Sequence, residues 1–420
     1  MAFQFLHAAD LHLDSPLHGL QQYPGAPVEA IRGAARRALE RLVQLAIDRK
    51  VAFVVIAGDL YDGDWRDYHT GLFFVQQARR LQAAGIPLYL ISGNHDAQNL
   101  MTRTLVLPEN TRMLASDRPE TVILDSIDVA IHGQSFAKRE VFEDLSLRYP
   151  QAQKGLFNIG VLHTSAAGAE GHEPYAPCKI EGLETRGYDY WALGHIHKRE
   201  VLCERPYVTF SGNIQGRHIR ETGPKGCWLV SVDDRRNVSL QFEELDVLRW
   251  EIASIDVSGC GTMDDVFAEV IQSCRKIEET TQDLPLAVRV VLNGMTPLHD
   301  SLVAHREKSV NNIRASAGND RVWIEKVSLH TKAPRRRSTA ADEGSLPWEE
   351  LLGCVAELRS DPAQASSLAP DVSDLINKLP SDLDLASAGL NLSDSAAWSE
   401  VLDEVESLLL DRLSDSEVSP

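Results

Sequence analysis

The chain has 420 residues, of which 43% are hydrophobic and 25% are charged, as in a globular protein with room for two or three domains. Its formal net charge is -19, but residues 338–420 hold 18 acidic and three basic residues, so most of that charge lies in the last fifth. The longest clean apolar run, Val51–Ala57, is far shorter than the roughly 20 residues of a membrane span. The start does not resemble a signal peptide, so we expect a cytoplasmic protein without a membrane partner.

The six cysteines are scattered along the chain and include no CxxC pair. This spacing predicts isolated reduced thiols and argues against a zinc ribbon or a disulfide framework. The charge distribution does not exclude a nucleic-acid substrate, because residues 1–337 are only slightly acidic. No broad basic region in the sequence indicates one, however.

Strands and helices are predicted to alternate through the first hundred residues. Residues 3–9 and 87–92 favour strands, and helical spacing runs through 28–50 and 70–84. Between the two helices, the β-branched run 54–57 ends in Gly58-Asp59 and predicts a buried central strand. This order is typical of βαβ units and predicts a mainly parallel sheet.

A second set of strands is predicted beyond residue 120. It comprises 121–124, 129–133, 157–163, 188–193, 201–203, 207–210 and 226–232, with a helix over 137–148. We expect this set to be more antiparallel than the first. The predicted fold class is α/β, an α+β sandwich of two packed mixed β-sheets flanked by helices.

Three domains are predicted. Residues 1–246 form the first, and residues 247–333 form a small α+β domain with the order β-α-β-α-β. Residues 334–420 contain a basic hinge, Arg335–Arg337, and an acidic tail with amphipathic helices over 346–358 and 397–413. These helices either dock on their own domain or fold onto a partner.

Polar side chains follow five of the predicted strands. They are Asp10, His12, Asp59, Asn94, His95, His163, His195 and His197. Imidazole nitrogen with carboxylate oxygen suits Mn²⁺, Zn²⁺ or Fe²⁺. Because residues two apart on a strand share a side, Asp10 with His12 and His195 with His197 can each face one pocket. Ions about 3.5–4 Å apart need a shared anion, and the carboxylate of Asp59 is the natural bridge.

A two-metal site predicts displacement at phosphorus, for which a proton donor to the leaving oxygen is useful. His95 is the candidate general acid, and Asp96 is predicted to hold its ring. Arg217 and His218 either contact the scissile phosphate or DNA backbone, or form structural ion pairs. His7 and His132 are predicted core histidines.

The segments Ala9–Asp14, Gly58–Tyr61, Gly93–Asp96 and Gly194–His197 resemble those of the calcineurin-like metallophosphoesterase superfamily, and more narrowly its SbcD-type nucleases. Gly212–His218 and Glu221–Cys227 are similar to the YhaO-like bacterial branch. The resemblance implies one metal on Asp10, His12, Asp59 and His197, and another on Asp59, Asn94, His163 and His195. It implies His95 as the catalytic histidine, two divalent ions, with Mn²⁺ expected, and exonuclease and endonuclease activity on DNA in repair.

The resemblance also implies an SbcC/Rad50-type coiled-coil ATPase partner and a DNA-capping role for residues 247–333. A second copy of the chain is a further candidate partner. At one position this chain departs from the pattern, because Asp62 stands where many relatives have histidine. Asp62 either is a solvated acidic residue in a turn or alters the way in which the site positions phosphate.

Two other readings remain open. The enzyme could act on small nucleotides or phosphoproteins, or the fold could be a non-catalytic scaffold. The small domain at 247–333 favours a polymer substrate, since a cap beside the site is unnecessary for a small molecule. The complete ligand set with His95 argues against a scaffold.

Overall fold

The computed structural model describes residues 2–15, 25–62, 69–97, 105–166, 175–281, 284–334 and 353–358, together with Leu402 and Val405. The predicted basic hinge and most of the acidic tail lie outside these residues. The chain divides into two compact units, one of Met1–Ile252, Ile277–Val288 and Asp320–Glu325 and one of Ala253–Lys276, Arg289–Asn319 and Lys326–Pro420. Within the described ranges, no helix is both long and apolar enough to cross a membrane.

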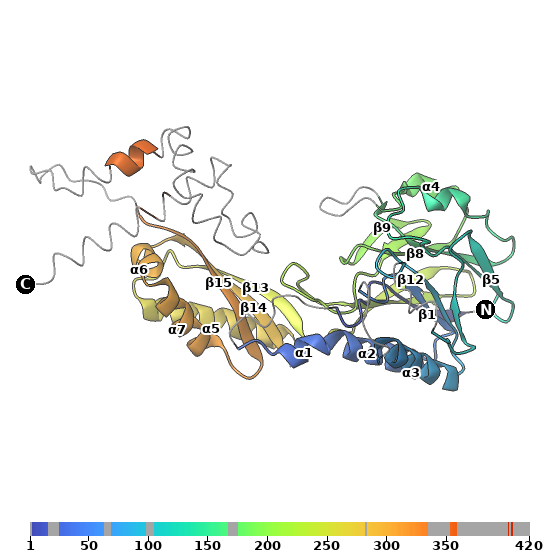
Figure 1. Ribbon diagram of the computed structural model, residues 1–420, viewed down its shortest axis with the longest axis horizontal. Coiled ribbons are helices and arrows are strands. Elements are labelled where there is room, and N and C mark those ends of the chain that lie inside the picture. The colour runs from blue at the N-terminus through green and yellow to red at the C-terminus, as the bar shows by residue number, and fades with distance from the viewer. Residues whose placement is uncertain are drawn as a thin grey trace, which may run out of the picture. The chain divides into compact units, whose positions relative to one another are not determined.

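Two six-stranded sheets form the first unit, which confirms the predicted fold class (Figure 1). The first sheet runs in the order β12 (Val238–Glu244), β11 (Gly226–Val232), β1 (Phe3–Ala8), β2 (Phe53–Ala57), β3 (Leu88–Ile91) and β4 (Thr111–Met113). The second runs β5 (Glu120–Leu124), β6 (Val129–Gly133), β7 (Phe157–His163), β8 (Tyr190–Gly194), β10 (Tyr207–Phe210) and β9 (Glu200–Glu204).

Alternate residues of the central strands face two different cores. Phe5 and Val55 point between the sheets, where they join Ile159 and Tyr190 of the second sheet in one apolar cluster. The residues next to them in the chain belong to a second apolar cluster. This cluster lies between the outer face of the first sheet and the helices that cover it. All five residues of β2 are buried, as expected for a strand covered on both faces.

Helices α2 (Ala34–Arg49) and α3 (His69–Ala83) cover the outer face of the first sheet. The predicted helix 28–50 is divided at Gly33, which separates the short α1 (Val28–Arg32) from α2. The outer core of the second sheet includes Leu183 of α4 (Ile180–Glu184) and Leu145 of the 3₁₀ turn η3 (Leu145–Arg148).

Three local predictions were wrong. Residues 226–232 belong to the first sheet, where β11 pairs antiparallel with β1, and not to the second. The second sheet is less antiparallel than expected, because β6–β7, β7–β8 and β8–β10 are all parallel pairs. The predicted helix 137–148 is reduced to η3 at its end. In the first two cases non-local strand pairing overrides a local pattern.

A third sheet has the order β13 (Arg249–Asp256), β14 (Leu286–Met295) and β15 (Val322–Lys332). Helix α5 (Met263–Thr280) joins the first two strands, and α6 (His299–Ala304) and α7 (Arg306–Ala317) join the last two. The predicted β-α-β-α-β order is therefore present, with the second helix broken at His305.

Candidate metal centre

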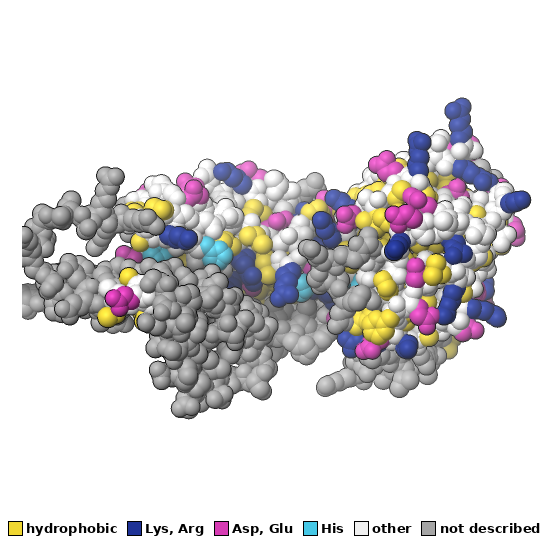
Figure 2. Space-filling model, turned by 90° about the horizontal axis from the view of Figure 1, so that it is seen from above, with side chains coloured by type: hydrophobic (Ala, Val, Ile, Leu, Met, Phe, Trp, Pro, Cys, Tyr) yellow, Lys and Arg dark blue, Asp and Glu magenta, His cyan; other side chains and the backbone are white. Residues whose placement is uncertain are grey.

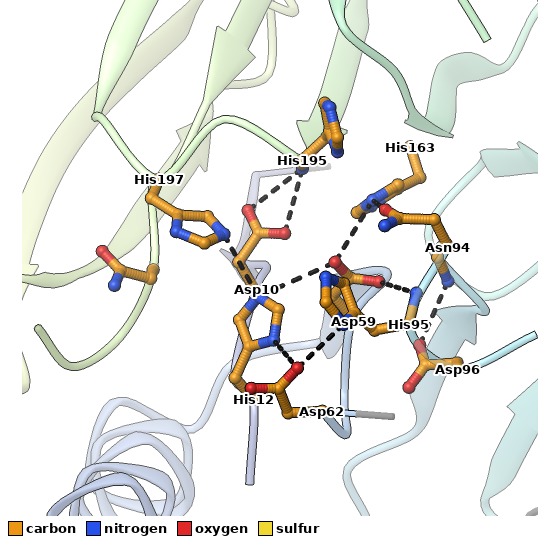
Figure 3. Close-up of polar contacts among 12 residues, drawn as sticks. Asp10, His12, Asp59, Asp62, Asn94, His95, Asp96, His163, His195 and His197 are labelled. Carbon is orange, nitrogen blue, oxygen red and sulfur yellow. Dashed lines mark hydrogen bonds and ion pairs between the residues drawn. The ribbon is translucent and has the colours of Figure 1, made fainter. Parts of the chain in front are cut away.

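The predicted ligands gather where five strands end (Figure 3). Asp10, Asp59 and Asn94 follow the neighbouring parallel strands β1, β2 and β3, whereas His163 ends β7 and His195 follows β8. The two sheets approach closely here, since a Cβ built on Gly194 would lie 2.0 Å from the carbonyl oxygen of Ala57. Only glycine permits this approach, which brings the ligands of both sheets into one site.

The backbone at these strand ends is in the left-handed region. The φ angles are 52° at Asp10, 44° at His12, 50° at Asp59 and 100° at His195. The expectation that Asp10 and His12 share a side through strand alternation is therefore wrong, because β1 ends at Ala8 and turns bring the side chains together. Non-glycine residues are rarely held in this conformation, and they concentrate at functional sites.

Asp10, His12 and His197 form the first ligand group, with their ligand atoms all within 4.8 Å of one another. The Nε2 atoms of His12 and His197 are 3.1 Å apart, although these residues are 185 positions apart in the chain. The Asp59 carboxylate stands at the edge of this group, 3.7 Å from Nε2 of His12. These are the four residues expected around one metal.

Asp10, Asp59 and His163 form a second group with the same spacing. Nε2 of His163 lies 2.9 Å from Oδ1 of Asn94 and 3.5 Å from Oδ2 of Asp59. The Asp59 carboxylate oxygen thus lies between His12 of the first group and His163 of the second.

His195 contributes differently from the other predicted ligands. Its backbone N–H donates to both carboxylate oxygens of Asp10, at 3.0 and 3.1 Å. Its ring centroid lies 5.2 Å from that of His163 and 5.8 Å from that of Tyr175. Among the described residues, the groups of three with ligand spacing do not include it.

The ionisation of these residues suits divalent cations. Asp10 and Asp59 are each 1% exposed, and burial raises the pKa of Asp10 to about 7, with the charge of Asp59 adding to the effect. Burial also lowers the pKa of His12 and of His163 to about 3, so both imidazoles are neutral near pH 7. Nδ1 of His12 is buried and lies 3.8 Å from Oδ1 of Asp62, beyond hydrogen-bond distance. Neutral imidazole is the form of histidine that binds metal, and a cation held here would offset the cost of the buried Asp10 and Asp59 charges.

His95 lies on the more open side of the centre. Its side chain is 33% exposed, and its Nδ1 lies 2.8 Å from Oδ1 of Asp62. Its backbone N–H donates to Oδ1 of Asp59 at 3.0 Å. Burial alone would lower the pKa of His95, but the hydrogen bond with Asp62 and the charge of Asp59 outweigh it and raise that pKa.

Asp96 does not hold the ring of His95, so that prediction was wrong. Its buried carboxylate accepts from the backbone N–H groups of Leu60, Tyr61 and Gly93, at 3.0, 2.8 and 3.1 Å. Asp96 therefore ties the turn after β2 to the turn after β3. A carboxylate satisfied by three backbone donors has a structural role in both turns.

Asp62 is the partner of His95 and is not a solvated turn acid. Its side chain is only 16% exposed, and it also contacts Nη1 of Arg217 at 3.2 Å and Oγ of Ser15 at 2.5 Å. Burial would raise the pKa of Asp62, but the adjacent His12 and His95 hold it well below its usual range. Asp62 is therefore ionised and oriented toward the imidazole.

Glu221 is a site residue that the sequence patterns did not reveal. Its Oε1 lies 2.7 Å from Nδ1 of His197, and its Oε2 accepts from Nδ2 of Asn213 at 3.0 Å and from the backbone N–H of Arg217 at 2.7 Å. A carboxylate on the second nitrogen of a ligating histidine fixes the ring's tautomer and direction. Glu221 lies in a segment distinguished only by its resemblance to the YhaO-like branch, and no spacing pattern connected it with His197.

Arg217 forms structural ion pairs, which is one of the two roles that the sequence left open for it. Its Nη1 contacts Asp62, and its Nη2 contacts Glu221 at 3.2 Å, so it joins the partner of His95 to the partner of His197. His218 is peripheral, with a side chain 54% exposed and Nε2 3.7 Å from Glu221. His7 and His132 are fully buried, consistent with core positions.

Comparisons with known proteins agree with this geometry. Residues 3–199 match the model of the calcineurin-like phosphoesterase family, and residues 250–332 match the middle domain of metallophosphoesterase YhaO. The chain is 38% identical over 297 residues to metallophosphoesterase YhaO of Bacillus subtilis (strain 168), covering 70% of this chain and 72% of that protein.

More distant relatives are named DNA double-strand break repair protein Mre11. The protein from Sulfurisphaera tokodaii is 27% identical over 74% of this chain and 78% of its own length. The protein from Methanopyrus kandleri is 24% identical over 60% of this chain and 59% of its own length. The family match, the ligand groups and the identity to YhaO lead to one conclusion: the chain belongs to the calcineurin-like metallophosphoesterases, hydrolases of phosphoester bonds that use divalent metals, and within them to the YhaO-like branch.

Proposed function

We propose that this protein is a nuclease that hydrolyses DNA phosphodiester bonds at a centre of two divalent ions, with Mn²⁺ as the working metal. The observation that carries the proposal is the position of Asp59, whose carboxylate oxygen lies 3.7 Å from His12 and 3.5 Å from His163. A single carboxylate between two groups of imidazole and carboxylate ligands is the arrangement that two adjacent cations require.

In this proposal each residue has a defined role. One ion would be held by Asp10, His12, Asp59 and His197, and the other by Asp59, Asn94, His163 and His195. Divalent ions there supply Lewis acidity at the phosphoryl oxygens and lower the pKa of water. Asp10 and Asp59 balance the positive charge, and Glu221 keeps the ring of His197 in its ligating direction.

His95 would protonate the leaving oxygen. Its pKa is raised by the hydrogen bond with Asp62 and the charge of Asp59, and both favour the protonated ring that a general acid needs. The contact with Asp62 engages Nδ1. Nε2 is then the atom that can face the substrate, and its proton is the one that a leaving sugar alkoxide would take.

The proposal of DNA as substrate rests on the relatives named for DNA double-strand break repair. On the face shown in Figure 2, the Lys and Arg side chains of the first unit, at the right, stand among Asp and Glu and form no continuous basic surface. We therefore expect the polymer to be held by contacts near the centre and by residues 247–333 acting as a cap. A coiled-coil ATPase of the SbcC/Rad50 type is the proposed partner, with the acidic tail as a candidate docking segment.

The direct test incubates the purified chain and Mn²⁺ with end-labelled duplex and single-stranded DNA, and separately with p-nitrophenyl phosphate and bis(p-nitrophenyl) phosphate. We expect DNA cleavage that EDTA abolishes and Mn²⁺ restores, and loss of cleavage in Asp59→Ala. Hydrolysis of p-nitrophenyl phosphate with no cleavage of either DNA would favour a phosphatase. Cleavage of bis(p-nitrophenyl) phosphate alone would favour a small-molecule phosphodiesterase, and no hydrolysis of any substrate would favour a scaffold.

A further inference from the structure

An exposed aromatic side chain lies beside the His163 and His195 side of the candidate centre. Phe142 is 64% exposed, and it is the only aromatic among the large apolar side chains that are exposed in the described part of the chain. A phenyl ring left in water forgoes the stabilisation of burial, so an exposed one beside an active centre is a candidate binding surface.

A row of rings connects Phe142 to the centre. Its ring centroid lies 6.2 Å from that of Tyr175, and the ring of Tyr175 lies 5.8 Å from that of His195. Phe142 is therefore no more than about 12 Å from the ring of His195. Tyr175 is only 6% exposed, so Phe142 is the member of the row that solvent, or a ligand, reaches.

The segment that carries Phe142 is fixed to the same centre. At its start, the buried ring of Phe136 packs edge-on against His163, with centroids 5.4 Å apart. Nearer its end, the carbonyl of Val141 accepts a hydrogen bond of 2.6 Å from the backbone N–H of Ala176, the residue after Tyr175. The chain leading up to Phe142 is thus held at two points, Phe136 and Val141, which lowers the entropic cost of binding a flat ligand against the ring.

Two cations share this segment. Lys138 and Arg139 are exposed, lie four and three residues before Phe142, and form no ion pair with a described residue; of the exposed acids in the segment, Glu140 follows Arg139 and Glu143 pairs with Arg148. An exposed aromatic ring with cations in the same short segment is a combination that binds single-stranded nucleic acid, in which the base stacks on the ring and the cations contact the backbone. A base in duplex is already stacked on both faces and cannot use the ring unless the end frays.

We propose that Phe142 is a stacking platform for an unpaired nucleobase, one to a few nucleotides from the scissile phosphate. Successive nucleotides of a strand advance about 3.4 Å when stacked and further when extended, so a base within that range reaches the ring. The inference rests on the proposed nuclease function and sharpens it, because it assigns a single strand or a frayed end, and not intact duplex, to this side of the centre.

Binding measurements test the platform independently of cleavage. The full-length chain is titrated in EDTA with a fluorescent single-stranded oligonucleotide and with the same sequence as a blunt duplex. We expect Phe142→Ala to weaken single-strand binding roughly 5- to 150-fold, the range for loss of one stacked base, and to change duplex binding much less. Phe142→Trp should bind like the wild type. The matched control is Leu147→Ala, which removes another exposed apolar side chain, 62% exposed, and should change nothing.

Two further readouts separate stacking from a simple apolar contact. Phe142→Leu keeps an apolar side chain without a π face, so it should bind as weakly as the alanine variant. Hydrolysis of bis(p-nitrophenyl) phosphate in Mn²⁺ should be unchanged in Phe142→Ala, because the ring contact of Phe142 is with Tyr175, which is not a predicted ligand.

The outcomes are distinct. If the wild type binds and cleaves DNA and Phe142→Ala binds single strands with the same affinity as the wild type, the stacking platform is refuted. The nuclease proposal is unaffected by that result. Full recovery of binding in Phe142→Leu also overturns stacking. Wild type that neither binds nor cleaves any DNA overturns both proposals.

Discussion

The Asp62 carboxylate lies 2.8 Å from Nδ1 of His95, and the same carboxylate lies 3.2 Å from Arg217. Asp62, where the sequence departs from the expected pattern, is therefore the residue that contacts the candidate general acid. Because Asp62 is ionised and only 16% exposed, its charge acts on the imidazole with little screening by solvent.

Asp62→Asn should lower kcat for DNA cleavage by roughly 10- to 100-fold, part of the 10²–10⁴-fold that general acid catalysis supplies. Removing the negative charge also lowers the pKa of His95. Activity that needs protonated His95 falls as pH rises through that pKa, so this falling limb should move to lower pH. The measurement is the pH dependence of kcat, with the exposed Asp125→Asn as the control.

The leaving group gives an internal check on this assignment. A p-nitrophenolate departs without a proton, whereas a sugar alkoxide does not, so His95→Asn and Asp62→Asn should both impair DNA cleavage far more than bis(p-nitrophenyl) phosphate hydrolysis. Equal losses on the two substrates would show that these residues act on metal binding and not on the leaving group.

Glu221→Gln should weaken divalent metal binding by roughly 10- to 100-fold, the usual effect of losing a carboxylate that orients a ligating histidine. The side chain keeps its size but loses the charge that holds the ring of His197, 2.7 Å away. Isothermal titration with Mn²⁺ measures the change, and Glu200→Gln on the exposed edge strand β9 is the matched control. Unaltered Mn²⁺ affinity in Glu221→Gln would refute this orienting role.

His7 should make the fold sensitive to acid. Its Nε2 lies 3.1 Å from the carbonyl oxygen of Leu193 and must donate there, so Nδ1 accepts from the hydroxyl of Tyr190 at 2.9 Å. Burial lowers its pKa to about 3, against an ordinary value of 6.5, so below pH 6.5 the unfolded chain takes up a proton that the folded chain does not.

The free energy of unfolding should therefore fall by up to about 1.4 kcal/mol per pH unit from this residue alone as pH drops below 6.5. His7→Gln keeps a donor for Leu193 but does not titrate. Urea unfolding followed by Trp fluorescence between pH 6.5 and 4.5 should give a shallower pH dependence for the variant, and identical slopes would contradict the assignment. Other buried histidines titrate in both proteins and cancel in the comparison.

Much of the centre could be predicted because its ligands follow local signals. An apolar run that ends in Gly-Asp or in Gly-His is visible in sequence, and parallel strands bring such ends to one edge of a sheet. Asp10, His12, Asp59, Asn94, His163 and His197 were found in this way, and the structure brings them together.

What sequence could not supply depends on contacts between distant segments. Arg217 and Asp62 are 155 positions apart, and Glu221 meets His197 through a loop without regular periodicity. The same reason explains the misplaced strand β11, whose residues alternate as they would in either sheet and whose partner β1 lies at the other end of the first unit's sequence. The left-handed turns at Asp10 and His12 are likewise invisible to a pattern that assumes extended strands.

The central claim is that Asp59 bridges two ions, and anomalous diffraction from crystals soaked in Mn²⁺ tests it most directly. We predict two manganese peaks about 3.5–4 Å apart with the Asp59 carboxylate between them, and neither peak in Asp59→Ala crystals treated alike. A single peak, or two peaks that persist in Asp59→Ala, would contradict the account.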